Sequence, residues 1–539
     1  MRCSVKKALL VIGGTFHPFE PCAEILEGYL TGAGLCETTV TDDRKKLTRL
    51  GGYDLVILYT CGGKLTPAQE KSLCAFVNDG GGLLAIHAAN VMDDVNADYL
   101  EMVGTKFIGH GPITEFTVDI TADHDITKRI DSFRITDELY ICEKRAKRLR
   151  VLATALWQGE KHPMVYVRSY GKGRVCYVAP GHDERTFSNP LFQRICGKGV
   201  RWVTKERENK VVRAGIVGYG GAFNMGQHHA GLMRAAGLEV TAVCDLDGSR
   251  LEIAKEELGE DIETYTKIEE IAASDAVDMG IIITPHHVHC DNALEFLTRG
   301  KHAIVEKPFC ITADEATKMI DAANASGVML STYHNRRWDA DFMTIKHICD
   351  SGMIGEVFSV EACTGGYSHP GYWWRSHKPI SGGAIYDWGA HFMDWILNIM
   401  PGKIESVYGF YQKRVWHDVT NEDHCEAILR FEGDRKAQLE ISSIAAIGKD
   451  RWRILGTKGA LKSGHDCIQV VTHCCGSERR VDVPYVQPEG NGYYRNVAEH
   501  LLCGMPLSVT PESARRVIAV LENAEKSAAC GIPIEVPHE

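Results

Sequence analysis

The chain has 539 residues, which is more than one hydrophobic core can organise, so we expect two or three domains. Its hydrophobic content of 44% and charged content of 24% are typical of a soluble globular protein. The formal net charge of -11 provides no basic surplus to neutralise phosphates, which excludes a general binder of nucleic acids or anionic membranes.

The apolar segments and the cysteines indicate a cytoplasmic protein. No run of about 18 apolar residues is present, so no membrane span is expected. The N-terminal apolar run 8–12 breaks at two glycines, which favours a first β-strand over a signal peptide. The 19 cysteines contain no CxxC pair, and a disulfide framework is not expected in a chain of this length.

Residues 1–206 alternate short apolar strands with helices. The predicted elements are strands over 8–12, 55–59 and 83–86, a helix from Thr66-Pro67 to Asn78, a hairpin over 166–178, and a helix over 191–203. Proline is favoured in the first turn of a helix, where its missing N–H costs nothing. Buried strands separated by helices predict a mostly parallel sheet in this first domain.

A charged run at 205–210 separates this segment from a second one with the same rhythm. Strands are predicted over 212–217, 239–244, 279–283 and 302–305, with helices near 226–236, 249–258 and 290–299 between them. This pattern predicts a second parallel α/β domain over residues 211–333.

The pattern changes after about residue 334. Strands over 356–363, 404–412, 424–431 and 436–443 follow one another without intervening helices, and a last helix runs from Pro511 to Ala529 with Thr510 as its N-cap. Residues 334–539 therefore read as a C-terminal α/β domain with a large open, mostly antiparallel sheet. The expected fold class of the whole chain is α/β and α+β.

A glycine-rich turn containing Gly218, Gly220 and Gly221 lies between the first strand and the first helix of the second domain. Such glycines let backbone N–H groups approach a pyrophosphate at the helix N-terminus. A strict GxGxxG motif would need glycine at Phe223. Asp245 ends the next strand, where a carboxylate binds the ribose hydroxyls and repels a 2′-phosphate, so NAD is favoured over NADP. The alternative is a doubly wound domain that binds no dinucleotide.

Several motifs in combination make residues 211–535 resemble the Gfo/Idh/MocA oxidoreductases. They are the glycine-rich turn, Thr284-Pro285 with His289, Glu306-Lys307-Pro308, and Gly382-Gly383-Ala384 through Asp387 and His391. The resemblance implies a Rossmann domain that binds NAD(P) and an enzyme that oxidises or reduces sugars, cyclitols or related polyols. The implied cofactor-binding residues are Gly218, Gly220, Gly221, Phe223, Asn224, Asp245, Thr284, Pro285, His289, Glu306 and Lys307.

The resemblance implies that Lys307, Asp387 and His391 form the catalytic set, and the chemistry agrees with it. Alcohol oxidation needs a base for the hydroxyl proton, and histidine titrates near neutral pH. We predict that His391 is this base, that Lys307 orients and polarises the substrate oxygen, and that Asp387 supports both. The alternatives are a surface lysine at 307, and a helix histidine at 391 paired with Asp387 or Asp394.

Two segments rich in aromatic and arginine residues, 335–339 and 372–375, suggest a sugar site. Aromatic faces stack on sugar rings, and arginine or asparagine binds hydroxyls or carboxylates, although aromatic residues equally often belong to a core. The residues expected to contact substrate are Asn335, Arg336, Trp374, Arg375 and His391.

The first domain resembles the trehalose-utilisation (ThuA-like) family, relatives of class I glutamine amidotransferases with a flavodoxin-like fold. The motifs that carry the resemblance are His87-Ala88-Ala89, Gly109-His110, His124-Asp125-Ile126-Thr127, Asp137-Glu138-Leu139-Tyr140, Pro163-Met164-Val165, Gly171-Lys172-Gly173-Arg174-Val175 and Gly181-His182-Asp183. The amidotransferases carry a nucleophilic cysteine at a turn that is His87-Ala88-Ala89 here, so a thiol mechanism lacks its nucleophile.

Histidines and one acid at strand ends remain as the candidate site of the first domain: His17, His87, His110, Glu138 and His182. They suit a divalent metal, metal-free binding or catalysis on a sugar, or hydrogen-bonded structural histidines. No HxH or HExxH spacing decides between these alternatives, and the identity of any metal is unknown.

Together the two resemblances predict a carbohydrate enzyme with two functions. The second part would oxidise a ring hydroxyl, or reduce a keto group, of a sugar or glycoside with NAD, and the ThuA-like domain would process the same carbohydrate. Glycoside cleavage through a 3-keto intermediate would link them. The alternatives are a simple dehydrogenase with a non-catalytic carbohydrate-binding or assembly module, and a sensor without turnover. The expected partners are a small-molecule carbohydrate and further copies of the chain, through the C-terminal sheet.

Overall fold

The computed structural model describes residues 6–128, 130–205, 211–220, 223–474 and 476–537. They form two compact units, the first comprising residues up to 210 together with 499–506, and the second comprising 211–498 and 507–539. The predicted Rossmann and C-terminal domains thus share one unit, and 499–506 belong with the first unit rather than with the C-terminal domain. Most of the predicted linker, 206–210, lies outside the described residues.

The first unit is built on a nine-stranded sheet of order β2-β1-β3-β4-β11-β10-β9-β6-β7. Its strands are β1 (Lys6–Gly14), β2 (Cys36–Thr41), β3 (Leu55–Cys61), β4 (Gly82–Ile86), β6 (Thr114–Ile120), β7 (Phe133–Asp137), β9 (Arg150–Trp157), β10 (Glu160–Tyr170) and β11 (Gly173–Val178). The five neighbouring strands β2, β1, β3, β4 and β11 run parallel, as predicted. The remaining pairings, from β11 through β10, β9 and β6 to β7, are antiparallel. The parallel prediction therefore holds for one half of the sheet, and the predicted hairpin is β10–β11.

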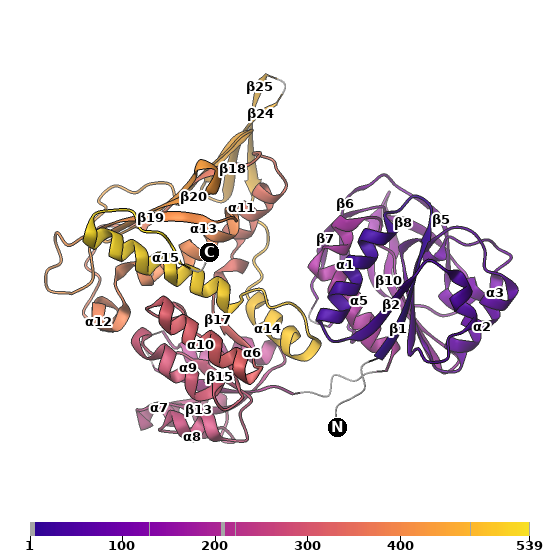
Figure 1. The fold of residues 1–539 in the computed structure, drawn as a ribbon, viewed down its shortest axis with the longest axis horizontal. Helices are drawn as coiled ribbons and strands as arrows, with labels where there is room; N and C mark the ends of the chain where they lie inside the picture. The colour runs from indigo at the N-terminus through magenta and orange to yellow at the C-terminus, as the bar shows by residue number, and fades with distance from the viewer. Residues whose placement is uncertain (1–5, 129, 206–210, 221–222, 475, 538–539) are drawn as a thin grey trace. The chain divides into compact units, whose positions relative to one another are not determined.

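Helices cover both faces of the parallel half, which is why β3 and β4 are buried along their whole length. The helices are α1 (Phe19–Gly32), α2 (Pro67–Asn78), α3 (Ala97–Val103), α4 (Glu184–Phe187) and α5 (Pro190–Val203) (Figure 1). Helix α2 begins where the sequence predicts, because Thr66 and Gln69 form a capping box. A separate two-stranded sheet pairs β5 (Thr105–His110) with β8 (Tyr140–Lys144).

The second unit begins with a six-stranded parallel sheet of order β14-β13-β12-β15-β16-β17. Its strands are β12 (Arg213–Val217), β13 (Glu239–Cys244), β14 (Glu263–Tyr265), β15 (Met279–Ile282), β16 (His302–Val305) and β17 (Leu330–Thr332). Its helices are α6 (Met225–Ala235), α7 (Gly248–Leu258), α8 (Ile268–Ala273), α9 (His289–Leu297) and α10 (Ala313–Ser326). The order reverses between β12 and β15, which is where doubly wound sheets form a ligand crevice.

The rest of the second unit is organised around an eight-stranded sheet of order β19-β20-β21-β18-β22-β23-β24-β25. Its strands are β18 (Val357–Gly365), β19 (Ile404–Gln412), β20 (His424–Phe431), β21 (Arg435–Ser442), β22 (Trp452–Gly456), β23 (Gly459–Ser463), β24 (Cys467–Cys474) and β25 (Ser477–Pro484). All the pairings are antiparallel except β18–β21, so the sheet is mostly antiparallel, as predicted.

The prediction that these strands follow one another without helices is wrong between β18 and β19. Helices α12 (Lys378–Ser381) and α13 (Trp388–Ile399) lie there. Helix α13 is buried on nearly all sides, and its sequence therefore lacks the polar face by which an amphipathic helix is recognised. The other helices are α11 (Ala340–Asp350), α14 (Gly492–Cys503) and α15 (Pro511–Cys530), the last with Thr510 as its N-cap, as predicted.

Strand residues alternate between a core face and an outer face in the eight-stranded sheet. In β20, Cys425, Ala427 and Leu429 are buried, and the residues between them are half-buried. Helices α11, α13 and α15 contact this sheet, and Figure 1 shows α13 and α15 on the same side of it. Homo-oligomerisation through the opposite face stays a prediction, which light scattering on the purified protein tests.

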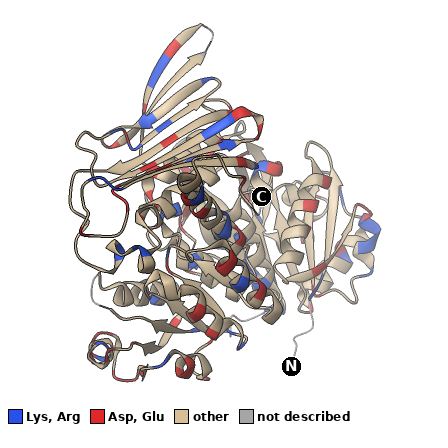
Figure 2. Cartoon of the chain, turned by 60° about the vertical axis from the view of Figure 1, so that its left-hand side comes forward, with Lys and Arg blue, Asp and Glu red and all other residues tan. Residues whose placement is uncertain are grey.

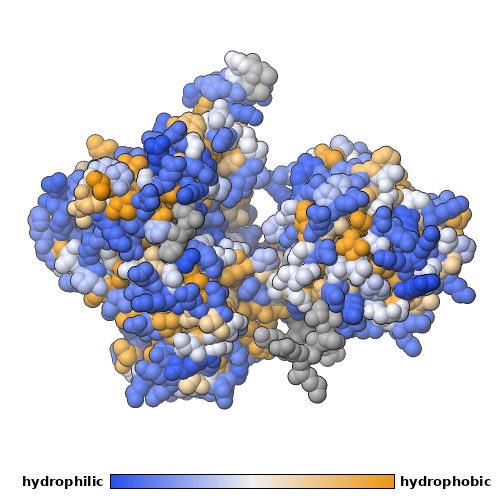
Figure 3. Space-filling model, in the orientation of Figure 1, coloured by the Kyte–Doolittle hydropathy of each residue, from blue (hydrophilic) through white to orange (hydrophobic). Residues whose placement is uncertain are grey.

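The predicted absence of a nucleic-acid partner stays a prediction. Lys and Arg are interspersed with Asp and Glu along the helices and strands of each unit (Figure 2), and much of the face seen in Figure 3 is hydrophilic. None of the helices in the described residues combines the length and the hydropathy that a membrane crossing requires.

Candidate functional sites

A cavity of about 920 Å³ opens at the carboxyl ends of the parallel strands in the second unit. Residues that directly follow these strands line it, among them Gly218 after β12, Asp245 after β13, Glu306 after β16 and Tyr333 after β17, and Lys307 follows Glu306. Parallel strands bring their carboxyl ends to one edge of the sheet, so residues far apart in the sequence meet here.

The glycine-rich turn forms one wall of this cavity. Gly218 has φ of 93°, and a Cβ on it would lie 2.8 Å from the carbonyl oxygen of Ile283, so only glycine fits there. A Cβ on Gly220 would meet nothing within 4 Å, which leaves this wall open for a ligand. Gly221 lies outside the described residues. Asn224, which was also predicted to contact the cofactor, does not line the cavity.

Asp245 lies where the sequence predicts and also shapes the glycine turn. Its carboxylate accepts hydrogen bonds from the backbone N–H of Tyr219 at 2.6 Å and of Asp247 at 2.9 Å. The acid therefore ties the end of β13 to the turn after β12 while it lines the cavity. Phe223, Thr284 and Pro285 line the cavity as well.

Lys307 and Asp387 form an ion pair in the cavity. The Lys307 Nζ lies 2.6 Å from Asp387 Oδ1, and Arg375 NH1 lies 2.7 Å from the same oxygen. Burial by itself would raise the pKa of the Asp387 carboxyl, but the charges of Lys307 and Arg375 outweigh it and hold that pKa below its usual range. Asp387 is therefore an ionised anchor for two cations. The Lys307–Pro308 bond is cis.

His391 lies on the second turn of α13, lines the cavity and is only 4% exposed. Burial lowers the pKa of its imidazole well below the usual range, and the nearby Lys307 charge adds to the effect. Among the described residues no carboxylate pairs with it, because Asp387 pairs with Lys307 and Asp394 pairs with Arg337. A neutral, unpaired imidazole at this wall suits a proton acceptor.

Two of the residues predicted to contact the cofactor, Glu306 and His289, have other contacts in the structure. Glu306 lines the cavity, but its carboxylate is 3.1 Å from His229 Nε2 and accepts the N–H of Lys307 at 2.7 Å, so it orients the lysine backbone. His289 is fully buried and does not line the cavity. Its ring nitrogens lie 2.8 Å from the carbonyl oxygens of Thr284 and Pro308, so it braces the cavity wall from behind. The spacing of residues in the sequence does not reveal whether a histidine after a strand faces the cavity or the core.

The residues predicted to bind substrate, Asn335, Arg336, Trp374 and Arg375, all line the cavity. Arg375 is held by Asp387 and lies over the ring of Trp374 at 5.0 Å. Arg336 pairs with Asp339 at 2.8 Å and lies over the ring of Trp388 at 4.6 Å. Aromatic surfaces and fixed cations thus share this wall, which suits a ligand that carries both apolar ring faces and oxygens.

The sequence reasoning missed His286, which lines the same cavity. Its Nδ1 lies 2.7 Å from the carbonyl oxygen of Ser381, whereas its Nε2 is buried and has no hydrogen-bond partner among the residues that the structure describes. Burial lowers the pKa of this imidazole well below its usual range. The available signal was its position directly after Thr284-Pro285, at the carboxyl end of a central strand. Trp388, which also lines the cavity, carried no such signal.

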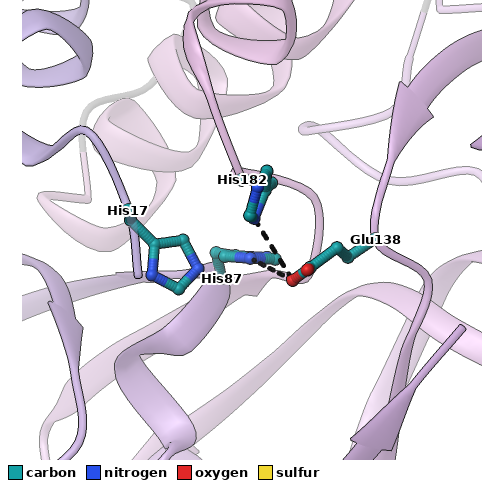
Figure 4. A group of neighbouring side chains, drawn as sticks. All are labelled: His17, His87, Glu138 and His182. Atoms are coloured by element: carbon teal, nitrogen blue, oxygen red, sulfur yellow. Dashed lines mark ion pairs between the residues drawn. The ribbon is translucent and has the colours of Figure 1, made fainter. Parts of the chain in front are cut away.

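In the first unit, four of the five predicted residues converge on one point. His17 follows β1, His87 follows β4, Glu138 lies between β7 and β8, and His182 follows β11. One side-chain nitrogen or oxygen from each lies within 4.8 Å of those of the others, and Figure 4 shows the four side chains facing one another. His110 stays at the rim, 3.5 Å from Glu138.

Backbone contacts hold this His–Glu cluster (His17, His87, Glu138, His182) in place. The His17 Nδ1 lies 2.9 Å from the carbonyl oxygen of Thr15, and the His87 Nδ1 lies 2.7 Å from that of Ala179. Burial lowers the pKa of His17 to about 4, so its imidazole is neutral at pH 7.

Asp137, which the sequence reasoning did not assign to the site, is buried beneath the cluster. Its carboxylate accepts the backbone N–H groups of Glu138 at 2.6 Å, Gly181 at 2.8 Å and His182 at 3.2 Å. One acid therefore sets the positions of two members of the cluster. The signal in the sequence was its place immediately before Glu138.

Family comparisons cover most of the chain. Residues 7–203 match the trehalose utilisation (ThuA) family. Residues 212–334 match the oxidoreductase family with an NAD-binding Rossmann fold, and residues 342–462 match the GFO/IDH/MocA C-terminal domain. These matches agree with the flavodoxin-like and Rossmann-type sheets described above.

Individual relatives match the second unit. A scyllo-inositol 2-dehydrogenase (NADP(+)) of Bacillus subtilis is 28% identical over 352 residues, which are 60% of this chain and 95% of that enzyme. An NAD-binding protein from Listeria innocua has a TM-score of 0.55 at 27% identity, over 61% of this chain and 97% of its own. A levoglucosan dehydrogenase in complex with NADH shares the fold, with a TM-score of 0.54 at 20% identity over 61% and 100%.

Proposed function

The chain is a fusion of a ThuA domain with an NAD-binding oxidoreductase of the Gfo/Idh/MocA family, and we propose that the oxidoreductase transfers hydride between NAD and a ring carbon of a sugar or glycoside. The convergence of Lys307, Asp387 and His391 in one cavity beside the glycine turn carries this proposal. The names of the inositol and levoglucosan dehydrogenases support a polyol or sugar substrate.

The residues of the cavity divide the chemistry between them. Bound nicotinamide supplies the hydride acceptor. The neutral His391 imidazole takes the hydroxyl proton as the carbon–hydrogen bond breaks, and the Lys307 ammonium stabilises the negative charge that develops on the oxygen. Asp387 keeps the ammonium in place through the 2.6 Å ion pair. In the reverse direction, protonated His391 returns the proton to the alkoxide.

The dinucleotide fits the cavity wall, and NAD is the preferred form in this proposal. Gly220 leaves open space at the turn, and Asp245 lines the cavity at the end of β13. A carboxylate at this position accepts hydrogen bonds from ribose hydroxyls and repels a 2′-phosphate. The relatives do not decide the preference, because one is named for NADP and another was solved with NADH.

A direct assay tests the oxidoreductase proposal. Purified full-length protein is mixed with NAD and a panel of sugars, glycosides and inositols, and NADH formation is followed by absorbance. Turnover that is lost in Lys307→Ala and kept in His347→Ala supports the assignment, since His347 is exposed on α11 and does not line the cavity. Full activity of Lys307→Ala contradicts the assigned role.

The ThuA domain, in this proposal, processes the keto-sugar that the oxidoreductase makes from a glycoside. A ketone at ring carbon 3 acidifies the hydrogen on carbon 2. A base removes that proton, and the carbon–hydrogen electron pair forms an enolate. The enolate pair then forms the carbon 1–carbon 2 double bond as the bond from carbon 1 to the aglycone oxygen breaks, and this oxygen takes a proton. Water adds across the double bond.

Reduction of the ketone by bound NADH would make the net reaction a hydrolysis and would regenerate NAD. Incubation with glycosides in deuterated water tests this route, because the proton that returns to carbon 2 comes from solvent. Deuterium at carbon 2 of the released sugar is expected. Release of sugar without deuterium at carbon 2 contradicts the elimination. Unchanged turnover of a natural glycoside by His87→Gln/His182→Gln favours a non-catalytic module instead.

A further inference from the structure

We propose that His17, His87, His182 and Glu138 bind one divalent transition-metal ion in the first unit. The His–Glu cluster offers three imidazoles and one carboxylate, with the nearest ligand atoms all within 4.8 Å of one another. These side chains come from three strand ends and one loop, and they point at a common centre (Figure 4).

The two distances from Glu138 to its neighbouring imidazoles match the edge of a coordination tetrahedron, and all four ligand atoms lie within 4.8 Å of one another. A metal with ligand bonds of about 2.0–2.2 Å in tetrahedral geometry separates its ligand atoms by roughly 3.4 Å. The Glu138 Oε2 lies 3.2 Å from His182 Nδ1 and 3.6 Å from His87 Nε2. These two distances bracket the distance expected between two ligand atoms of one metal ion.

The hydrogen bonds behind the cluster decide which nitrogens carry lone pairs. A carbonyl oxygen only accepts, so the Nδ1 atoms of His17 and His87 donate to Thr15 and Ala179. In a neutral imidazole the Nε2 is then an acceptor. Both Nε2 atoms face the centre and are buried, and like the Nδ1 of His182 they have no hydrogen-bond partner within the described part of the chain.

Several ring nitrogens and one carboxylate that face a common centre favour a bound cation. With their Nδ1 atoms donating to carbonyl oxygens, His17 and His87 turn their Nε2 atoms toward the same centre as the Glu138 carboxylate. A metal ion accepts all of these lone pairs together. The backbone carbonyls that orient the imidazoles are the outer partners that metal-binding histidines usually have. Imidazole with one carboxylate favours ions such as Zn²⁺ or Fe²⁺ over Mg²⁺ and Ca²⁺.

The cluster is closed on one side and accessible on the other. The His87 side chain has no exposed surface, whereas the side chains of Glu138, His182 and His110 are 12%, 16% and 41% exposed. A ligand therefore reaches the metal from the side of His110. This accessibility is typical of a catalytic site, because a structural metal is enclosed by its ligands.

The class of ligand follows if the proposed function is correct. A keto-sugar presents a ketone oxygen and an adjacent hydroxyl oxygen, and such a pair can bind one metal ion through both atoms. The metal acts as a Lewis acid that stabilises the enolate formed when the proton on carbon 2 leaves. We infer that the cluster binds a vicinal hydroxyketone, and this part of the inference depends on the proposed function.

Metal binding is tested on the full-length protein without any enzyme assay. Protein purified without chelators is analysed by mass spectrometry for bound metals, then stripped and titrated with Co²⁺ alone. About one metal ion per chain and a Co²⁺ absorption band in the visible range are expected. Glu138→Gln and His87→Gln should lose at least tenfold in Co²⁺ affinity. His162→Gln, on β10 and outside the cluster, is the matched control and should keep wild-type affinity.

Two outcomes overturn the metal site. One is wild-type protein that binds Co²⁺ no more tightly than Glu138→Gln does, and the other is equal loss in His162→Gln. Circular dichroism checks that each variant folds, and His182→Asn provides a second variant of similar shape if His87→Gln does not fold. If the wild-type protein binds Co²⁺ but does not turn over any sugar with NAD, the result contradicts the proposed function and leaves the metal site standing.

The ligand class has its own measurement. Dihydroxyacetone, the simplest sugar with an adjacent ketone and hydroxyl, should shift the Co²⁺ spectrum of the wild-type protein. Glycerol, which has the hydroxyls without the ketone, should not. An unchanged spectrum with dihydroxyacetone at concentrations that saturate free Co²⁺ overturns the hydroxyketone assignment and leaves the metal site itself to the titration.

Discussion

The cavity of the second unit and the His–Glu cluster of the first unit are both lined by histidines and charged groups, but their charge balance differs. In the cavity, Asp387 is paired with two cations, Lys307 and Arg375. In the cluster, a single carboxylate, Glu138, faces the ring nitrogens of three histidines, and the described residues place no lysine or arginine in the group. The paired ions around Asp387 suit an uncharged sugar substrate, whereas lone-pair-bearing atoms that converge on one centre suit a cation.

This contrast matters because histidine content alone does not distinguish the two kinds of site. His391 is a single buried imidazole next to a lysine, so its burial and the positive charge both keep it neutral and free to take a proton. The cluster instead uses backbone carbonyls to turn lone pairs toward one centre. The partner of the second ring nitrogen decides the role of each histidine.

The largest expected effect is on catalysis in the cavity. His391→Asn removes the base and should lower kcat for sugar oxidation by about 10²–10⁴-fold, in the range of general-base catalysis. Stopped-flow or steady-state NADH absorbance measures it, and metal content should stay at the wild-type value. Unchanged kcat would show that another group takes the proton.

Lys307→Met should have the next largest effect. Loss of the ammonium removes the group that stabilises charge on the substrate oxygen, so kcat/KM should fall by roughly 10²–10³-fold. The comparison variant is Glu138→Gln, which should leave oxidation of a free sugar unchanged because it lies in the other unit. An equal fall of kcat/KM in Lys307→Met and Glu138→Gln would contradict the assignment of sugar oxidation to the cavity.

Asp245→Ser tests the cofactor preference at a smaller scale. Removing the carboxylate should improve kcat/KM for NADP relative to NAD by on the order of tenfold, which corresponds to about 1.4 kcal/mol. Kinetics with the two cofactors at a fixed sugar concentration measure the ratio. Because Asp245 also holds the N–H of Tyr219, a general loss with both cofactors is expected as well. A ratio equal to that of the wild type contradicts the assigned role.

Ligand-dependent stability should separate the two units further. A metal at 100 times its dissociation constant stabilises the state that binds it by about 2.7 kcal/mol, so chelation should lower the melting temperature of the first unit by a few degrees. NAD should raise the melting temperature of the second unit only. Calorimetry with each ligand alone and with both checks this, and an NAD effect abolished by Glu138→Gln would contradict it.

The smallest expected effect is the pH dependence of oxidation near neutrality. Burial holds the pKa of His391 well below its usual value, so the proton-accepting form persists as pH falls below 6.5. The kcat/KM profile should stay flat through neutral pH and fall only when pH drops through the depressed pKa. An acid limb centred near 6.5 that disappears in His391→Asn would contradict the burial argument.

Much of the second unit follows from its sequence. Apolar runs ending at Gly218, Asp245, Thr284 and Lys307 predict parallel strands, and such strands bring those four residues to one edge. Strands β18 to β21 were also predicted, whereas β22 to β25 were not. Helix α13 was not predicted either, because its apolar residues on all sides lack the helical pattern. His289 and Arg375 show the limit for side chains: one turns into the core, and the other is held by Asp387.

The sequence by itself determined which residues were available: histidines after three strands of the first unit and an acid after a fourth. Only the tertiary structure decided that His17, His87, Glu138 and His182 meet while His110 stays at the rim. It also decided which ring nitrogens face the centre, through carbonyl groups that carry no sequence signature. Backbone acceptors are identical in every residue, so their effect on a histidine depends on where the fold places them.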